Sequence, residues 1–166
     1  MKHTILAVDD EPANLRMIER LFHKDYHVIT AESGEEALET LKNEEVHLII
    51  SDQRMPGMTG TELLKESLNM HPDAVKIILT GYSDTEAVIE AINRARVHKF
   101  VCKPWDPVQL RAIVADALSE RDRAVEQKQL LDSLVALVQS HPGFFNSGLA
   151  AYASASEVES TNTVRG

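Results

Sequence analysis

TILAVDD, residues 4–10, is a short apolar run that ends in two acidic residues, and the same arrangement recurs along the chain. The run LIIS at 48–51 leads to Asp52, and FVC at 100–102 leads to Lys103. If these runs are parallel strands of one sheet, their carboxyl ends lie at the edge where open α/β sheets bind ligands. The strand ends would then gather three carboxylates and one ammonium group in a pocket suited to a divalent cation and a phosphoryl group.

Strand-like runs alternate with segments of helical periodicity over most of the chain. Strands are predicted at 4–8, 27–31, 48–51, 76–79 and 99–102, and helices at 12–23, 34–43, 60–70, 84–94 and from 106 onward. Continuous apolar runs such as 48–50 and 77–79 are typical of strands buried on both faces. Five strand-helix units therefore predict an α/β fold, a doubly wound parallel sheet covered on both faces.

Composition limits the classes of function. The 166 residues suit one domain, with room for an appendage. A net charge of −9 argues against a general nucleic-acid-binding surface and against an anionic membrane surface. The single cysteine, Cys102, can build neither a disulfide framework nor a cysteine zinc site within one chain. With no room for a signal peptide before the first strand and no bilayer-length apolar run, a cytoplasmic setting is expected.

The last helical pattern continues beyond residue 119, where a five-unit domain should end. It passes through a charged segment at 120–129 into an apolar one at 130–138. One line of residues has the spacing of a coiled-coil seam: Ala117, Arg121, Ala124, Lys128, Leu131, Val135 and Val138. The alternative is a single helix that packs back on the domain. We expect the five-unit domain at 1–119, a helical extension that could form a coiled coil at 120–139, and a flexible tail or truncated linker at 140–166.

The acidic strand ends favour a cation site. The adjacent carboxylates of Asp9 and Asp10 repel each other, and a cation offsets that repulsion; magnesium prefers a few carboxylates with water and substrate oxygens. Asp52 would be the third acid. Each has a simpler alternative, because Asp10 is also a suitable helix N-cap and Asp52 a turn-forming residue. Lys103 precedes Pro104, which restricts its backbone, and its ammonium suits a phosphoryl oxygen.

Four motifs in order resemble the receiver domain of two-component response regulators over roughly residues 1–120. They are VDDE at 8–11, SDQRMPGMTG at 51–60, LTGY at 79–82 and FVCKPW at 100–105. The resemblance implies a flavodoxin-like (βα)5 sheet with strand order 2-1-3-4-5, and phosphoryl transfer from a histidine kinase to Asp52. The residues of these motifs are similar to those of receivers that precede ATPase-type transcription activators or cyclic-dinucleotide enzymes.

The same resemblance implies roles for individual residues. Magnesium would be held by Asp9, Asp10, Asp52 and the backbone carbonyl of Arg54. Lys103 and Thr80 would contact the phosphoryl oxygens, with Thr80 and Phe100 as the switch pair. Many receivers carry tyrosine at the Phe100 position, so a switch here would rest on packing without that hydroxyl. Arg54 and Tyr82 occupy positions that tune the lifetime of the phosphoryl group, and their bulk predicts slow self-dephosphorylation.

The output of such a receiver is not apparent in the sequence. No Walker loop, cyclic-dinucleotide signature or DNA-binding module follows Val138, so the chain is expected to be a fragment or to act by binding a partner. We expect a signalling phosphoacceptor in transcription control, and a homodimer through the last helix or the face near Trp105. The alternatives are a degenerate receiver that only binds proteins and a haloacid-dehalogenase-type phosphatase, which would need an acid where Arg54 stands.

Overall fold

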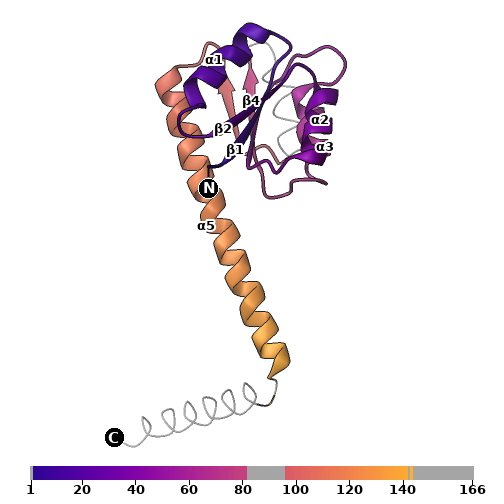
Figure 1. The fold of residues 1–166 in the computed structure, drawn as a ribbon, viewed down its shortest axis with the longest axis vertical. Helices are drawn as coiled ribbons and strands as arrows, with labels where there is room; N and C mark the ends of the chain where they lie inside the picture. Colours follow the sequence, from indigo (N-terminus) through magenta and orange to yellow (C-terminus); the bar gives the residue numbers. More distant parts are fainter. Residues whose placement is uncertain (1, 82–95, 142, 144–166) are drawn as a thin grey trace, which may run out of the picture. The chain divides into compact units, whose positions relative to one another are not determined.

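A computed structural model describes residues 2–81, 96–141 and 143. Within them, parallel strands form one sheet in the order β2-β1-β3-β4-β5, which confirms the predicted fold (Figure 1). The strands are β1 (Thr4–Val8), β2 (His27–Ala31), β3 (Leu48–Asp52), β4 (Val75–Thr80) and β5 (Lys99–Cys102). The predicted helix at 84–94 lies outside the described residues.

Four helices accompany these strands in the described ranges: α1 (Pro12–Phe22), α2 (Gly34–Asn43), α3 (Gly60–Ser67) and α5 (Pro107–Ser140). Local signals explain where they begin. Ser33 caps α2 by accepting a hydrogen bond from the Glu36 N–H, and Thr59 forms a reciprocal capping box with Glu62 at α3. Pro12 occupies the first turn of α1.

Helix α3 ends earlier than residue 70, where the sequence pattern placed its end. After Ser67, the N–H groups of Leu68, Asn69 and Met70 bond to carbonyls three residues earlier. Hydrogen bonds that span three residues instead of four tighten the chain into turns and end an α-helix. The apolar periodicity continues through Met70, so it could not reveal this change.

Two apolar layers cover the two faces of the sheet. Helices α1 and α5 pack on one face, and α2 and α3 on the other (Figure 1). Helix α1 contributes Leu15, Ile18 and Phe22 to the first layer. Strand β3 is buried along its whole length, as its uninterrupted apolar run predicted.

Helix α5 enters the core only through its first turns. Its buried residues are Leu110, Val114, Ala117 and Leu118. The chain divides by compactness into residues 1–123 and 124–166. Ala117 is 4% exposed and belongs to the core layer on α1, so it is not available to the predicted coiled-coil seam.

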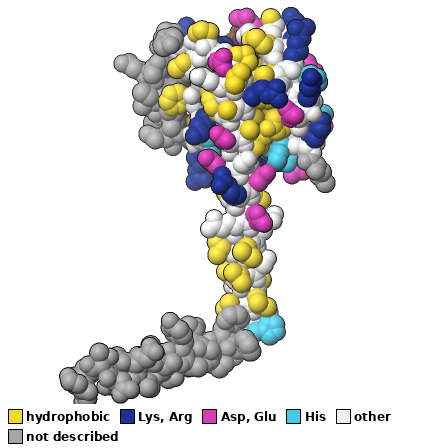
Figure 2. All heavy atoms as spheres, turned by 90° about the vertical axis from the view of Figure 1, so that its left-hand side faces the viewer, with side chains coloured by type: hydrophobic (Ala, Val, Ile, Leu, Met, Phe, Trp, Pro, Cys, Tyr) yellow, Lys and Arg dark blue, Asp and Glu magenta, His cyan; other side chains and the backbone are white. Residues whose placement is uncertain are grey.

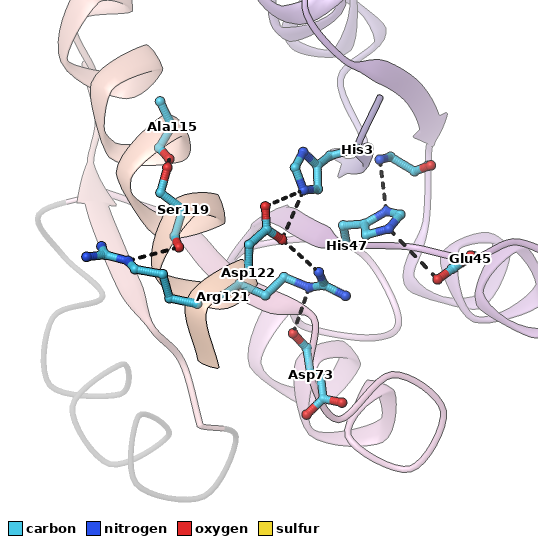
Figure 3. Close-up of polar contacts among 10 residues, drawn as sticks. His3, Glu45, His47, Asp73, Ala115, Ser119, Arg121 and Asp122 are labelled. Atoms are coloured by element: carbon cyan, nitrogen blue, oxygen red, sulfur yellow. Dashed lines mark hydrogen bonds and ion pairs between the residues drawn. The ribbon is translucent and has the colours of Figure 1, made fainter. Parts of the chain in front are cut away.

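Polar contacts fix α5 at the amino-terminal edge of the sheet (Figure 3). The Arg121 Nε donates to the Asp73 carbonyl at 3.1 Å, and the Asp122 carboxylate lies 2.9 Å from the His3 Nε2. The His3 ring meets the His47 ring edge to face. Arg121, whose side chain is 17% exposed, is therefore engaged with the domain, which explains a cation at a predicted seam position.

The later part of α5 is apolar on its surface. Six residues there are exposed: Leu130, Leu131, Leu134, Val135, Leu137 and Val138. Figure 2 shows hydrophobic side chains gathered along this part of the helix. In the described part of the chain, no helix has the length and apolar character needed to cross a bilayer.

Candidate functional site

The strand ends that the sequence singled out meet at the carboxyl edge of the sheet. Asp9 directly follows β1, Asp52 is the last residue of β3, and Lys103 directly follows β5. Strands β1, β3 and β4 are neighbours, with Val8 opposite Ser51 and Asp52 opposite Leu79. This parallel register places Asp9 level with Asp52, and Lys103 lies two residues beyond that level because Leu79 is opposite Val101.

Asp9, Asp10 and Asp52 form an acidic cluster in which one carboxylate oxygen from each lies within 4.8 Å of the others. Asp9 and Asp52 are buried, at 1% and 7% exposure, whereas Asp10 is exposed. Three converging carboxylates provide the hard oxygen ligands that magnesium prefers, and the exposed member leaves a side open to water and substrate. The donor set therefore fits a divalent cation.

The alternative role for Asp10 as a helix cap is wrong. The N-cap of α1 is Glu11, and its own side chain makes no cap hydrogen bond. The Glu11 N–H instead donates to the Asp9 Oδ1 at 2.9 Å. Asp9 is thus oriented by the start of α1, and Asp10 is left at the mouth of the cluster.

Lys103 forms an ion pair with Asp52. Its Nζ lies 2.6 Å from the Asp52 Oδ1 and 3.9 Å from the Asp9 Oδ2. The backbone holds this lysine as well, because its N–H donates to the Thr80 carbonyl at 2.8 Å. The Lys103–Pro104 peptide bond is cis. The alternative of Asp52 as a simple turn residue does not account for a buried carboxylate in contact with an ammonium group.

Burial is the largest influence on both members of this pair. Desolvation raises the pKa of Asp52; contact with Lys103 opposes that rise, and the charges of Asp9 and Asp10 add to it. For Lys103, desolvation lowers the pKa, but the bond and charge of Asp52 outweigh it, so the net shift is upward. The lysine is therefore firmly cationic. The carboxylates of Asp9 and Asp10 repel that of Asp52, and a bound cation would relieve this repulsion.

The loop after β3 is clamped by Gln53, which the sequence reasoning did not select. The Gln53 side chain donates to the Thr61 hydroxyl at 3.2 Å and accepts from the Thr61 N–H at 3.1 Å. Its carbonyl accepts from the Gly60 N–H at 3.1 Å. Gln53 is buried, and a buried amide needs hydrogen-bond partners. The sequence shows only that a glutamine follows Asp52, and it does not show this burial.

Gly60, the first residue of α3, packs its backbone against the Asp52 carbonyl. A Cβ at Gly60 would collide with the Asp52 carbonyl oxygen and would lie 2.9 Å from the Ile78 side chain. Only a residue without a side chain lets α3 start this close to the end of β3. The position of the candidate acceptor is thus set by helix packing.

The remaining predicted residues lie around this cluster. Thr80 ends β4, is buried, and donates its hydroxyl to the Gly81 carbonyl at 3.2 Å. Phe100 is 48% exposed on β5 and belongs to neither core layer. Arg54 is exposed in the loop that follows Asp52. Trp105 packs partly against the core, and Tyr82 lies outside the described residues.

Asn14, on the first turn of α1, is a second residue that the sequence reasoning missed. Its side-chain amide donates to the Asp9 Oδ2 at 3.0 Å. Asparagine is a poor helix former, so its presence inside the first turn of α1 was a weak signal of a side-chain role.

Comparisons with known proteins agree with the geometry. Residues 5–115 match the response regulator receiver domain family. The hydrogenase transcriptional regulatory protein HoxA of Cupriavidus necator is 38% identical over 69% of this chain and 24% of its own length. A Methanospirillum hungatei receiver described as CheY-like superposes with a TM-score of 0.71 at 30% identity, covering 75% of this chain and 99% of that one.

A further solved structure carries a different name. It is called an adenylate cyclase, from Rhodopirellula baltica, and superposes with a TM-score of 0.75 at 33% identity over 80% of this chain and 98% of that one. The chain spans about a quarter of the length of curated relatives such as HoxA. The same fold thus occurs in proteins with different names, and the likeness concerns the domain around the acidic cluster.

Proposed function

This chain belongs to the response regulator receiver domain family, and from that premise we propose that Asp52 is its phosphoryl acceptor. The observation that carries the proposal is the surroundings of Asp52. It is buried at a strand end, 2.6 Å from the Lys103 ammonium and within the acidic cluster of Asp9 and Asp10. Asp9 shares the cluster, but its Oδ2 lies 3.9 Å from the Lys103 ammonium, whereas the Asp52 carboxylate is in direct contact with it.

The donor is a phosphohistidine of a histidine kinase. A carboxylate oxygen of Asp52 forms the new P–O bond while the P–N bond to the donor histidine breaks, and that histidine takes up a proton to become neutral imidazole. The transition state spreads charge over the phosphoryl oxygens, so the acceptor site works by positioning and charge neutralisation. The Lys103 ammonium, already directed at Asp52, moves to a phosphoryl oxygen.

Magnesium is the proposed cofactor. Asp9, Asp10 and Asp52, together with the backbone carbonyl of Arg54, would hold it. When bound, the ion supplies positive charge at the phosphoryl oxygens and relieves repulsion among the three acids. The oxygen-only donor set supports magnesium over softer metals.

The switch is proposed to run from Thr80 to Phe100. The Thr80 hydroxyl, which now donates to the Gly81 carbonyl, turns toward the acyl phosphate, and Phe100 turns inward from its exposed position on β5. Because Phe100 lacks a hydroxyl, the gain comes from burying its ring. A ring that is half exposed has apolar surface left to bury, which supports this direction.

Phosphorylation is a signal and not a turnover reaction in this proposal. Arg54 and Tyr82 shield the acyl phosphate from water, so self-dephosphorylation is slow.

Mass spectrometry after incubation with acetyl phosphate and Mg²⁺ tests the acceptor. We expect one added phosphoryl group on the wild type and none on Asp52→Asn. The matched control Asp116→Asn, an exposed aspartate on α5, should be phosphorylated like the wild type, and EDTA should abolish the reaction. A wild type that stays unmodified, or an Asp52→Asn protein modified as fast as wild type, would overturn the proposal.

We further propose that residues 1–119 form the receiver and 120–139 a helical extension, with the first turn of the extension held to the receiver by Arg121 and Asp122. Residues 140–166 are assigned to a tail or linker. The protein acts in the cytoplasm as a homodimer, and its output is control of transcription, as the name of HoxA suggests. The exposed leucines and valines at 130–138 support the extension as the dimer contact, with the face near Trp105 as a second.

Light scattering tests this arrangement. Leu131→Glu and Leu134→Glu should convert a dimer into a monomer without affecting phosphorylation, because a charge within an apolar helix contact is unpaired. The exposed control Gln129→Glu should leave the mass unchanged. A monomeric wild type at every phosphorylation state would exclude dimerisation.

A further inference from the structure

Asp9 is a buried carboxylate with two competing demands on it. As part of the acidic cluster it faces the proposed metal, and its Oδ2 also lies 3.9 Å from the ammonium of Lys103. This is a long ion pair, and a small rotation of the carboxylate would shorten it into a direct contact. Such a contact would withdraw Asp9 from the metal and Lys103 from Asp52.

Contacts with α1 oppose this rotation. The Glu11 N–H holds the Asp9 Oδ1 at 2.9 Å, and the Asn14 amide holds the Oδ2 at 3.0 Å. The oxygen that Asn14 holds is the one that faces Lys103. The lysine itself is 2.6 Å from Asp52, so Asp52 and Asp9 are each provided with a separate donor.

Packing alone does not explain asparagine at this position. Residue 14 is partly exposed, beside the buried residues Leu15 and Ile18 on α1. A leucine would fit the same volume and favour the helix more. The amide is therefore present for its hydrogen bond, and the partner of that bond is the acid.

We propose that Asn14 is a positioning residue that holds Asp9 for the metal and keeps its long ion pair with Lys103 from closing into a direct contact. The proposal rests on the magnesium site proposed above. Residues that orient metal ligands in this way typically affect metal affinity by about 10- to 100-fold. Loss of the Asn14 amide should weaken magnesium binding while leaving the fold intact.

The decisive variant is Asn14→Leu, which keeps the size of the side chain and removes the donor. Calorimetric titration with magnesium chloride should give a dissociation constant about tenfold higher than wild type. The matched control is Asn43→Leu, because Asn43 ends α2 and its amide donates to the Glu39 carbonyl. That control should bind magnesium like wild type. Asn14→Ala, which adds no apolar surface, should repeat the loss, and urea unfolding should find both Asn14 variants folded.

Phosphorylation by acetyl phosphate provides the second measurement. In Asn14→Leu the magnesium concentration for half-maximal rate should rise about tenfold, and the rate at saturating magnesium should stay close to wild type. Wild-type affinity in a folded Asn14→Leu would overturn the positioning role and leave the proposed function standing. If the wild type binds no magnesium, or Asp10→Asn binds it as well as wild type, the metal site and this inference fail together.

Discussion

Gly60→Ala is the substitution that most directly tests how the fold positions Asp52. The new Cβ would meet the Asp52 carbonyl oxygen, with the Ile78 side chain at 2.9 Å and the Ser51 hydroxyl at 3.0 Å. The first of these is a backbone atom of a fully buried strand, so it cannot move aside as a side chain would. Helix α3 and β3 must separate by about an ångström to restore ordinary contact.

The expected cost is large for one methyl group. Overpacking of a tight interior costs about 1–3 kcal/mol, and this site belongs at the upper end because its main neighbour is backbone. The gain in helix propensity on replacing glycine returns at most about 1 kcal/mol. We therefore expect urea unfolding to show a loss of about 2–3 kcal/mol, with slower phosphorylation of Asp52 by acetyl phosphate.

Gly34→Ala is the matched control. Gly34 is also the first residue of its helix, α2, and the atoms nearest to a Cβ there would be the Met58 Cβ and Sδ at 2.8 Å and Cγ at 2.9 Å. The Sδ and Cγ can move by a change of rotamer, and the Cβ can move with the loop that carries Met58, so the loss should be about 1 kcal/mol, smaller than at Gly60. Equal losses in the two variants would refute the explanation from the Asp52 backbone.

Three other substitutions test separate features. Lys76 is fully buried and donates to the carbonyls of residues 71 and 74, and burial lowers its pKa to about 8. In the unfolded chain the Lys76 amine keeps its proton up to about pH 10.5, whereas in the folded protein it loses the proton near pH 8. The unfolding free energy of wild type should therefore rise by about 3 kcal/mol relative to Lys76→Met between pH 8 and 10.5. Urea unfolding that shows a constant difference between the two proteins over this range would contradict this expectation. Desolvation lowers the pKa of His47, whose Nδ1 accepts the Thr4 N–H at 3.0 Å. Stability should therefore fall as the pH drops from about 6.5 through the folded pKa, and His47→Asn, which keeps an acceptor, should lose less over that range in thermal unfolding. Arg54→Ala should speed loss of the phosphoryl label several-fold, and a wild-type half-life of seconds would count against shielding by Arg54.

The candidate site was predictable because its main signals are local. An acid or lysine that directly follows a buried strand is visible in the sequence, and parallel strands bring those positions to one edge. Asp9, Asp52 and Lys103 therefore lie together as expected. The order of the strands came with the resemblance of the motifs to a known family.

Other features depend on residues that are far apart or on exact distances. The amide of Asn14 matters because it reaches Asp9, and the glycine at 60 matters because α3 starts against the Asp52 carbonyl. Neither distance follows from a periodic pattern. The end of α3 at Ser67 likewise depends on a change in hydrogen bonding. After Ser67 the N–H groups of residues 68–70 bond to carbonyls three residues earlier instead of four, while the apolar periodicity continues.

The sequence by itself determined the alternation of strands and helices, the class of the sheet and the residues at its carboxyl edge, because burial imposes periods that a linear pattern records. Only the tertiary structure decided which partner each charged group takes. Lys103 lies 2.6 Å from Asp52 but 3.9 Å from Asp9, and Arg121 bonds to the backbone of Asp73, 48 residues away, instead of joining a seam. Charge pairing depends on separations of a few ångströms in space, and residue spacing along the chain does not encode those separations.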